Sequence, residues 1–360
     1  MHRFLSLLIL AFMLAACAEQ RVVVKQAVVP PIAATAMPEP TQTLVTPTMP
    51  ATITVPPTST ATAVATLTPA RTAMPTALPR PEIPRIGIQV GHWQTEQMPD
   101  ELERFRTSTG TFAAGVSEIE VNLAVSERVV ALLEAEGLTV DLLPATIPVK
   151  YHADAFVTIH ADGASSGNPR GFKVATPWRT SPASQLLMDS IVAEYAAGTG
   201  LPQDSAITVN MRGYYAFSWR RHQHAIARTT PAVIVEMGYL SNAQDRAFLV
   251  NQPDVIAQSI TNGILRYLDQ LDRSDATFYE PKEYPVHRAA NDGVVVRAAP
   301  SANAGSIFVM NGDKRFLPFR EVDGWYEGVV RGEWRVIGWV RKDDVVATDE
   351  PLTFPTPVGN

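Results

Sequence analysis

Three short apolar runs, each leading into a histidine or a glutamate, constrain the fold of this chain more than any other feature. The runs and the polar residues that follow them are 85–90 with His92, 155–159 with His160, and 232–235 with Glu236. Short runs rich in valine and isoleucine predict buried strands. In an open α/β sheet the three polar side chains would emerge at the carboxyl edge, where such folds place their ligands.

A fourth stretch predicts the start of a helix. Ser117 and Glu120 have the spacing of a capping box, and apolar residues then recur at roughly helical spacing until Gly137. Glu118 would therefore lie in the first helical turn, near the sheet edge. Asn122, one turn further, either hydrogen-bonds to Glu118 as a supporting residue or makes an ordinary contact within the helix.

These residue types suit a catalytic zinc site. Zn²⁺ in such sites takes about three protein ligands and leaves one position open for water, and two imidazoles with one carboxylate are a suitable set. The predicted ligands are His92, Glu118 and His160. Water acidified by the metal becomes a usable nucleophile, and a separate carboxylate can move its proton. Glu236 is predicted to do so.

The same stretches resemble the zinc-dependent N-acetylmuramoyl-L-alanine amidases of the amidase 3 family, over residues 84–272. The four matching motifs lie, in the family's order, at 91–94, 118–123, 158–162 and 235–242. The resemblance implies the metal ligands and the catalytic glutamate just named. It also implies an open, mostly parallel sheet with helices on both faces.

Three departures from the family pattern concern substrate access rather than metal binding. Trp93 replaces a small residue beside the first ligand, Asp162 replaces an asparagine, and the usual Thr-Arg is absent at 142–144. No substrate-binding residue is predicted.

Residues 1–16 are predicted to be a lipoprotein signal peptide. Arg3 precedes an apolar run that is too short to span a bilayer as a helix of about 20 residues. The run ends in Leu-Ala-Ala-Cys, which resembles a lipobox, and Cys17 is the only cysteine, so an intramolecular disulfide is excluded. Lipidation of Cys17 is favoured over an ordinary signal peptide with an incidental cysteine, and more than one acyl chain would anchor the protein stably.

Residues 17–83 are rich in Thr, Pro and Ala and are predicted to be a disordered tether. The tether either lets an anchored catalytic domain reach the cell wall or is a glycosylated or merely permissive spacer. A formal net charge of −6, with no basic stripe, argues against a nucleic-acid partner.

Helices are expected near 182–197 and 252–271, then a linker at 273–286 and a tail at 348–360. Between these, residues 287–347 alternate β-branched and aromatic residues with glycine turns, which predicts a small all-β barrel. Its Val-Val-Arg-Ala-Ala-Pro and two Gly-Trp motifs resemble bacterial SH3-like domains. Trp325, Tyr326 and Trp339 either line a groove for wall peptide or belong to the core, and the core is favoured for Trp339.

The resulting prediction is an exported, membrane-anchored lipoprotein that faces the cell wall and hydrolyses the amide between N-acetylmuramic acid and L-alanine in peptidoglycan. One alternative is a non-catalytic peptidoglycan-binding lipoprotein in which Trp93 blocks the site. A second is a zinc peptidase acting on stem peptides, although the His-Glu-x-x-His helix of common metalloproteases is missing. The sequence leaves the oligomeric state open.

Overall fold

The computed structural model describes residues 80–332 and 336–351, which form two separate sheets and one short hairpin. The predicted signal peptide, Cys17 and all of the predicted tether before Arg80 lie outside the described residues. Within the described ranges, the helices are either too short or too polar to cross a membrane.

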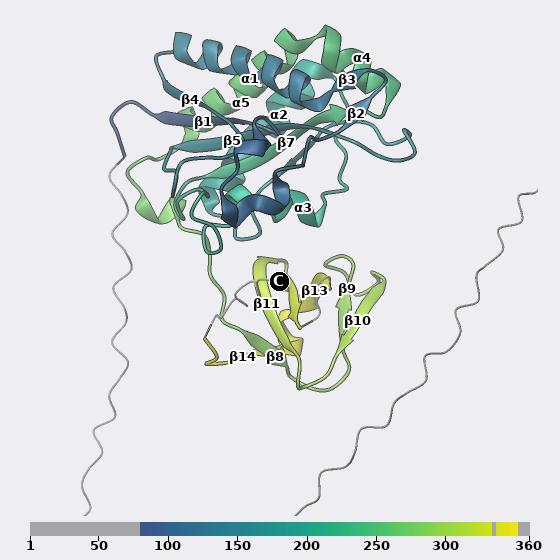
Figure 1. The fold of residues 1–360 in the computed structure, drawn as a ribbon. Helices are drawn as coiled ribbons and strands as arrows, with labels where there is room; N and C mark the ends of the chain where they lie inside the picture. Colours follow the sequence, from purple (N-terminus) through teal and green to yellow (C-terminus); the bar gives the residue numbers. More distant parts are fainter. Residues whose placement is uncertain (1–79, 333–335, 352–360) are drawn as a thin grey trace, which may run out of the picture. The chain divides into compact units, whose positions relative to one another are not determined.

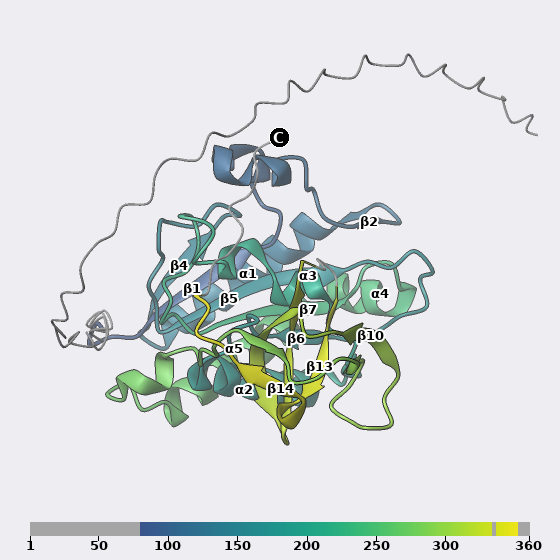
Figure 2. The ribbon, with the colours of Figure 1, turned by 90° about the horizontal axis from the view of Figure 1, so that it is seen from below.

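The first sheet is mostly parallel, as predicted (Figures 1 and 2). Its strands, in spatial order, are β4 (Thr139–Leu143), β1 (Arg85–Val90), β5 (Ala155–Asp162), β7 (Ala232–Tyr239) and β6 (Lys173–Ala175). Only β6, at the edge, runs antiparallel to its neighbour. The three central strands are β1, β5 and β7, and their near-continuous burial explains why they appear in the sequence as apolar runs rather than alternating patterns.

One face of this sheet is covered by long helices. They are α1 (Glu118–Ala135), α2 (Pro182–Thr199), the shorter α4 (Ala243–Asn251) and α5 (Pro253–Gln270). Their apolar side chains form one core with alternate residues of the strands, such as Ile88, Val157 and Val235. The predicted helices near 182–197 and 252–271 are thus confirmed.

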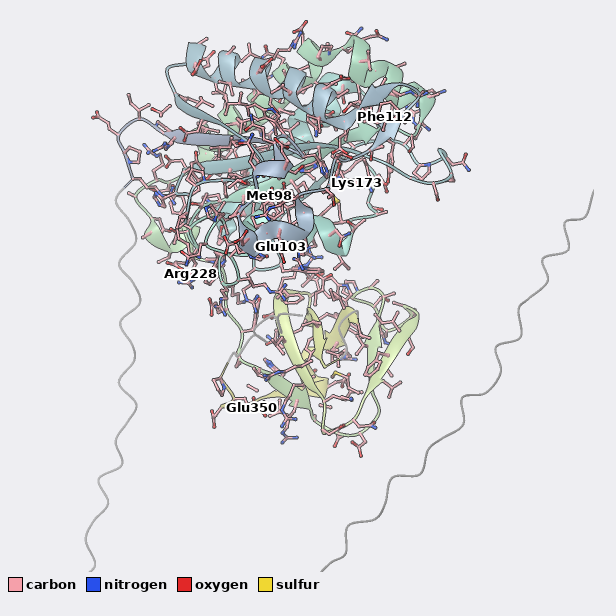
Figure 3. All side chains as sticks on the ribbon, in the orientation of Figure 1. Met98, Glu103, Phe112, Lys173, Arg228 and Glu350 are labelled. Carbon is pink, nitrogen blue, oxygen red and sulfur yellow. The ribbon has the colours of Figure 1, made fainter. Side chains whose placement is uncertain are left out.

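Among the described residues, the other face carries only short elements. The prediction of helices on both faces is therefore correct for the long helices on one face only. These elements are the 3-10 turns η1 (Thr95–Gln97), η2 (Asp100–Phe105) and η3 (Tyr215–Phe217) and the single-turn helix α3 (Val209–Arg212). They pack on the intervening strand residues, including Phe156 and Ile234. Met98 and Glu103 mark this covering segment in Figure 3, on the side of the sheet opposite α1.

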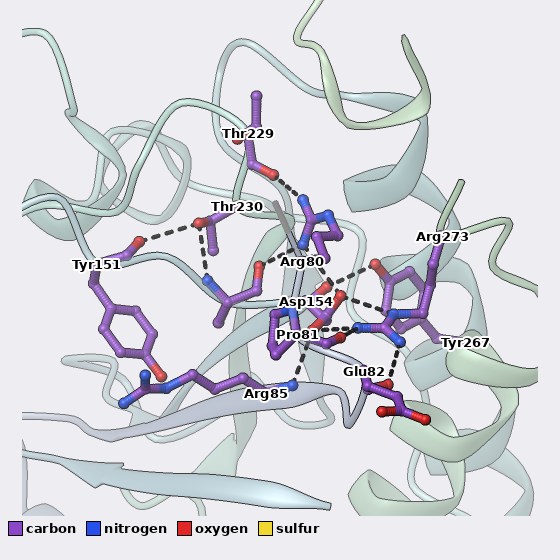
Figure 4. Close-up of polar contacts among 11 residues, drawn as sticks. Arg80, Pro81, Glu82, Arg85, Tyr151, Asp154, Thr229, Thr230, Tyr267 and Arg273 are labelled. Atoms are coloured by element: carbon purple, nitrogen blue, oxygen red, sulfur yellow. Dashed lines mark hydrogen bonds and ion pairs between the residues drawn. The ribbon is translucent and has the colours of Figure 1, made fainter. Parts of the chain in front are cut away.

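A buried carboxylate fixes the amino end of the sheet (Figure 4). Asp154 is fully buried and accepts hydrogen bonds from the backbone N–H of Arg85 at 2.9 Å and from the guanidinium groups of Arg80 and Arg273. The Arg80 guanidinium also lies 3.4 Å above the ring centroid of Tyr279. Asp154 therefore joins the segment before β1 to the segment that follows α5.

The second sheet is entirely antiparallel, which agrees with the predicted all-β segment. Its strands, in chain order, are β8 (His287–Ala289), β9 (Val294–Arg297), β10 (Ser306–Met310), β11 (Arg315–Val322), β12 (Trp325–Arg331), β13 (Ile337–Arg341) and β14 (Val345–Ala347). Asp323 and Gly324 have φ values of 46° and 80°, as the tight turn between β11 and β12 requires. Trp339 is 7% exposed, in keeping with the favoured core role.

The remaining short elements are the hairpin β2 (Phe112–Ala113) and β3 (Val116–Ser117) and the 3-10 turns η4 (Ala276–Tyr279) and η5 (Lys342–Asp344). The hairpin leads directly into α1, so it lies next to the predicted ligand Glu118.

We expect Asp154→Ala to lower the free energy of unfolding by about 3 kcal/mol, because removal of one member of a buried ion pair leaves its partners uncompensated. Denaturant unfolding followed by tryptophan fluorescence measures the change. Asp100→Ala is the control, since Asp100 pairs with Arg106 but is 95% exposed and should contribute little. An equal effect of both substitutions would contradict the structural role of Asp154.

Candidate functional site

The turn after β1 brings His92 toward the sheet. His92 has a φ of 62°, an uncommon left-handed conformation for a residue other than glycine. The preceding Gly91 leaves room for the second histidine, because a Cβ atom at this position would lie 2.5 Å from Nδ1 of His160. The strained backbone of His92 thus lies next to the close contact between Gly91 and His160, and such strained residues cluster at functional sites.

Glu118 is the first residue of α1, where it was predicted. Ser117 is the N-cap, but its side chain makes no capping hydrogen bond, so the predicted capping box is wrong. The loop before the hairpin holds the Glu118 carboxylate instead: Oε2 accepts a hydrogen bond from the N–H of Thr111 at 2.6 Å. Gly110 permits this contact, since a Cβ there would lie 2.5 Å from the same oxygen.

His160 and Glu236 lie within their strands rather than beyond the carboxyl ends, which corrects the sequence prediction. β5 continues to Asp162 and β7 to Tyr239, and His160 pairs in register with Glu236. Because side chains alternate between faces, both residues lie on the face that the long helices leave uncovered. Neighbouring strands are about 4.8 Å apart, so the two side chains are adjacent.

The three predicted ligands converge on one point. Glu118 Oε1 lies 3.1 Å from Nδ1 of His160 and 3.5 Å from Nε2 of His92. The two imidazole rings are nearly perpendicular, with centroids 5.0 Å apart. Among the described residues this is the one group of three or more potential ligands whose donor atoms lie within 4.8 Å of one another.

The other nitrogen of His92 is occupied in a way that favours metal binding. Nδ1 of His92 lies 2.9 Å from the carbonyl oxygen of Ser108. A carbonyl oxygen can only accept, so Nδ1 carries the hydrogen and Nε2 keeps its lone pair on the side of Glu118. Asn122 completes the support, since its amide donates to Glu118 Oε1 and to the carbonyl of Gly91, both at 3.3 Å.

The electrostatics also fit a cation. Burial opposes ionisation of Glu118, but the hydrogen bond and charge of His160, the nearby His92 and the N–H of Thr111 lower its pKa to about 2. Burial and the neighbouring His160 lower the pKa of His92, which keeps this ring neutral and able to bind a metal at neutral pH. Burial would lower the pKa of His160, yet its hydrogen bond to Glu118 raises it.

The pKa of Glu236 is shifted in the opposite direction from that of Glu118. Burial raises its pKa to about 8, and its Oε2 atom is inaccessible to solvent and has no hydrogen-bond partner. Lys173 lies opposite Glu236 on β6, but its ammonium group forms an ion pair of 2.6 Å with Asp162. A carboxyl group with such a pKa, beside a potential metal site, can both accept and return a proton near neutral pH.

Trp93 does not seal the site. The side chain of His92 keeps 21% of its surface exposed, so solvent reaches a predicted ligand. Trp93 itself is half-buried, and its carbonyl accepts a backbone hydrogen bond from Ala145. This accessibility weakens the alternative of a blocked, non-catalytic site.

Several supporting residues were missed by sequence reasoning. Ser108, Thr111, Lys173 and Tyr214 reach the site from loops or from the edge strand, and none belongs to a recognised motif. Burial raises the pKa of Tyr214 to about 12, so its hydroxyl stays protonated. Gly91, in contrast, belongs to the predicted motif at 91–94.

The model of the N-acetylmuramoyl-L-alanine amidase family, Amidase_3, matches residues 86–266, which is half of the 360 residues. The N-acetylmuramoyl-L-alanine amidase LytC of Bacillus subtilis is 26% identical over 174 residues, covering 44% of this chain. The match spans 33% of the length of that relative.

Two solved structures are similar to just over half of the chain. An N-acetylmuramoyl-L-alanine amidase from Clostridium difficile 630 is 16% identical, with 52% of this chain and 98% of that chain covered and a TM-score of 0.39. The catalytic domain of CwlV from Bacillus (Paenibacillus) polymyxa var. colistinus is 22% identical, with 52% and 99% covered and a TM-score of 0.35.

The raised pKa of Glu236 predicts a pH-dependent effect of Glu236→Gln on the metal-free protein. Between its ordinary pKa of about 4.5 and about 8, the folded state keeps the proton that the unfolded chain releases. Stability of the wild type therefore falls through this range on account of this group, whereas glutamine does not titrate.

The free energy of unfolding of Glu236→Gln should thus increase relative to wild type as pH rises from 5 to 8. Urea unfolding of chelator-treated protein at each pH unit tests this. A difference that stays constant with pH would show that Glu236 is ionised in the folded state.

Proposed function

This chain belongs to the N-acetylmuramoyl-L-alanine amidase family, and we propose that it hydrolyses the amide bond between N-acetylmuramic acid and L-alanine in peptidoglycan. The observation that carries this proposal is the convergence of Nε2 of His92, Oε1 of Glu118 and Nδ1 of His160, with Glu236 in register beside His160. Two imidazoles and a carboxylate are a donor set that Zn²⁺ accepts in catalytic sites.

His92, Glu118 and His160 would hold the zinc ion. When bound, Zn²⁺ supplies Lewis acidity, which polarises the scissile carbonyl and acidifies water. Glu118 contributes the negative charge of the ligand set, and its low pKa keeps it ionised at neutral pH. Thr111 and Asn122 orient its two oxygens and so limit the positions that the carboxylate can adopt.

Glu236 transfers a proton from the attacking water to the leaving amine. Its carboxylate accepts the proton of the attacking water and returns it to the nitrogen of the departing L-alanine, so the same group acts first as base and then as acid. Burial on the sheet face, which raises the pKa of Glu236, favours the return step. The proton lost by water is the one gained by the amine, and no other proton carrier is required.

The segments around the catalytic domain would place this activity at the cell wall. The proposal includes a signal peptide at 1–16, lipidation of Cys17, a tether at 17–83 that lets the domain at 84–272 reach peptidoglycan, and an SH3-like domain at 287–347 that binds the wall. The all-antiparallel second sheet supports the last of these assignments.

Glu236→Gln should separate chemistry from metal binding. We expect the variant to retain zinc and to lose roughly 10² to 10⁴ in turnover, the usual cost of losing general acid–base catalysis. His160→Ala should lose both the zinc and the activity. Metal analysis and mass spectrometry of muropeptides after digestion measure the two effects.

The products also distinguish the proposed reaction from its alternatives. An amidase releases whole stem peptides with a free L-alanine amine, a stem peptidase releases fragments, and a binding protein releases nothing. Full zinc content in His160→Ala, or wild-type turnover in Glu236→Gln, would contradict the assigned roles.

Cys17→Ser should abolish membrane association. The rest of the predicted tether contains no apolar run able to enter a bilayer, so acyl chains on Cys17 would be the anchor. Fractionation of cells that express each form measures the partition, and hydrolysis of soluble muropeptides should be unchanged. Membrane association that survives the substitution would refute the lipoprotein assignment.

A further inference from the structure

Tyr214 lies between α3 and η3 and reaches His160 from a loop 54 residues later in the chain. Its hydroxyl oxygen is 3.3 Å from Nε2 of His160, the nitrogen that does not face Glu118. Its ring meets the imidazole edge-on at 5.4 Å and packs on Tyr215 and Phe217, with centroids 4.5 and 5.5 Å away. The aromatic packing holds the hydroxyl against the imidazole.

The hydrogen positions in this contact follow from a backbone carbonyl. The hydroxyl of Tyr215 lies 2.6 Å from the carbonyl oxygen of Ala145, which can only accept, so Tyr215 donates its single hydrogen there. The hydroxyl of Tyr214 then donates to the oxygen of Tyr215 at 3.2 Å. With that hydrogen committed, the oxygen of Tyr214 is left as an acceptor, and Nε2 of His160 must be the donor.

Gln89 reinforces this direction. Its amide nitrogen donates to the carbonyl of Ala145 at 2.8 Å and to the hydroxyl of Tyr215 at 3.2 Å. The oxygen of Tyr215 thus accepts two hydrogen bonds while it donates one, which uses its full capacity. If these hydrogen bonds ran in the opposite direction, the carbonyl of Ala145 would not receive the hydrogen of Tyr215.

We propose that Tyr214 and Tyr215, ending on the carbonyl of Ala145, form a tyrosine relay that keeps a hydrogen on Nε2 of His160, so that Nδ1, which donates to Glu118 in this structure, is the nitrogen that exchanges its hydrogen for zinc. The inference rests on the proposed zinc site, because Nδ1 is the nitrogen that faces Glu118. Ser108 does the same for His92 through the opposite nitrogen. Tyr214 and Tyr215 are positioning residues, since neither lies among the three proposed ligands.

The test measures zinc affinity of the full-length protein by competition with a chelator of known affinity. We expect Tyr214→Phe, which keeps the ring and removes the hydroxyl, to weaken zinc binding by about 10- to 100-fold, the usual cost of losing such a partner. Tyr215→Phe should also weaken it, because it frees the Tyr214 hydroxyl to donate to Nε2 and thereby favours hydrogen on Nδ1.

The double variant distinguishes a relay from packing. If the relay acts as one unit, Tyr215→Phe has no further effect on zinc affinity once Tyr214 is Phe. Tyr151→Phe is the matched control: the buried Tyr151 donates to Asp141 at 2.5 Å, away from the ligands, so this variant loses a comparable hydrogen bond and should keep wild-type zinc affinity.

Each outcome has a separate meaning. Wild-type protein that binds no zinc would overturn the proposed function itself. Zinc-binding wild type with an unchanged affinity in Tyr214→Phe, or an undiminished effect of Tyr215→Phe in the double variant, would overturn the relay. Should Tyr214→Phe not fold, as judged by circular dichroism, unchanged affinity in Tyr215→Phe would likewise overturn it, and weakened affinity there alone would support it.

Discussion

The site depends on one buried carboxylate held between two imidazoles. Glu118 would be costly to bury alone, and its charge is compensated by contacts with His92, His160 and the backbone of Thr111. These contacts join the start of α1 to three other segments, which are the turn after β1, the loop before the hairpin and β5. Much of the local backbone is therefore arranged around this single group.

The uneven cover of the first sheet makes room for the site. The long helices pack on one face of the sheet, against every second residue of the strands. Because side chains alternate between the two faces, His160 and Glu236 lie on the other face. The short elements there leave part of His92 accessible to solvent. The absence of side chains at Gly91 and Gly110 lets the proposed ligands approach one another.

The Asp154 cluster and the site lie at opposite ends of β1. Asp154 binds the N–H of Arg85, the first residue of this strand, while His92 follows its last residue. Six residues at about 3.3 Å each separate the two ends by roughly 20 Å. Arg80, which also contacts Asp154, therefore lies at the end of β1 away from the proposed ligands.

The sequence alone predicted the three central strands, the principal helices and the four polar residues that the fold brings together, because strand and helix periodicity are local properties and the motifs carry the chemistry. It did not determine which nitrogen of each histidine faces Glu118, nor the role of Tyr214, which approaches His160 across 54 residues. It predicted a capping box that Ser117 does not form, and strand ends before His160 and Glu236 that β5 and β7 extend beyond. These features depend on contacts between distant segments, on burial and on hydrogen-bond partners, which only the tertiary structure decides.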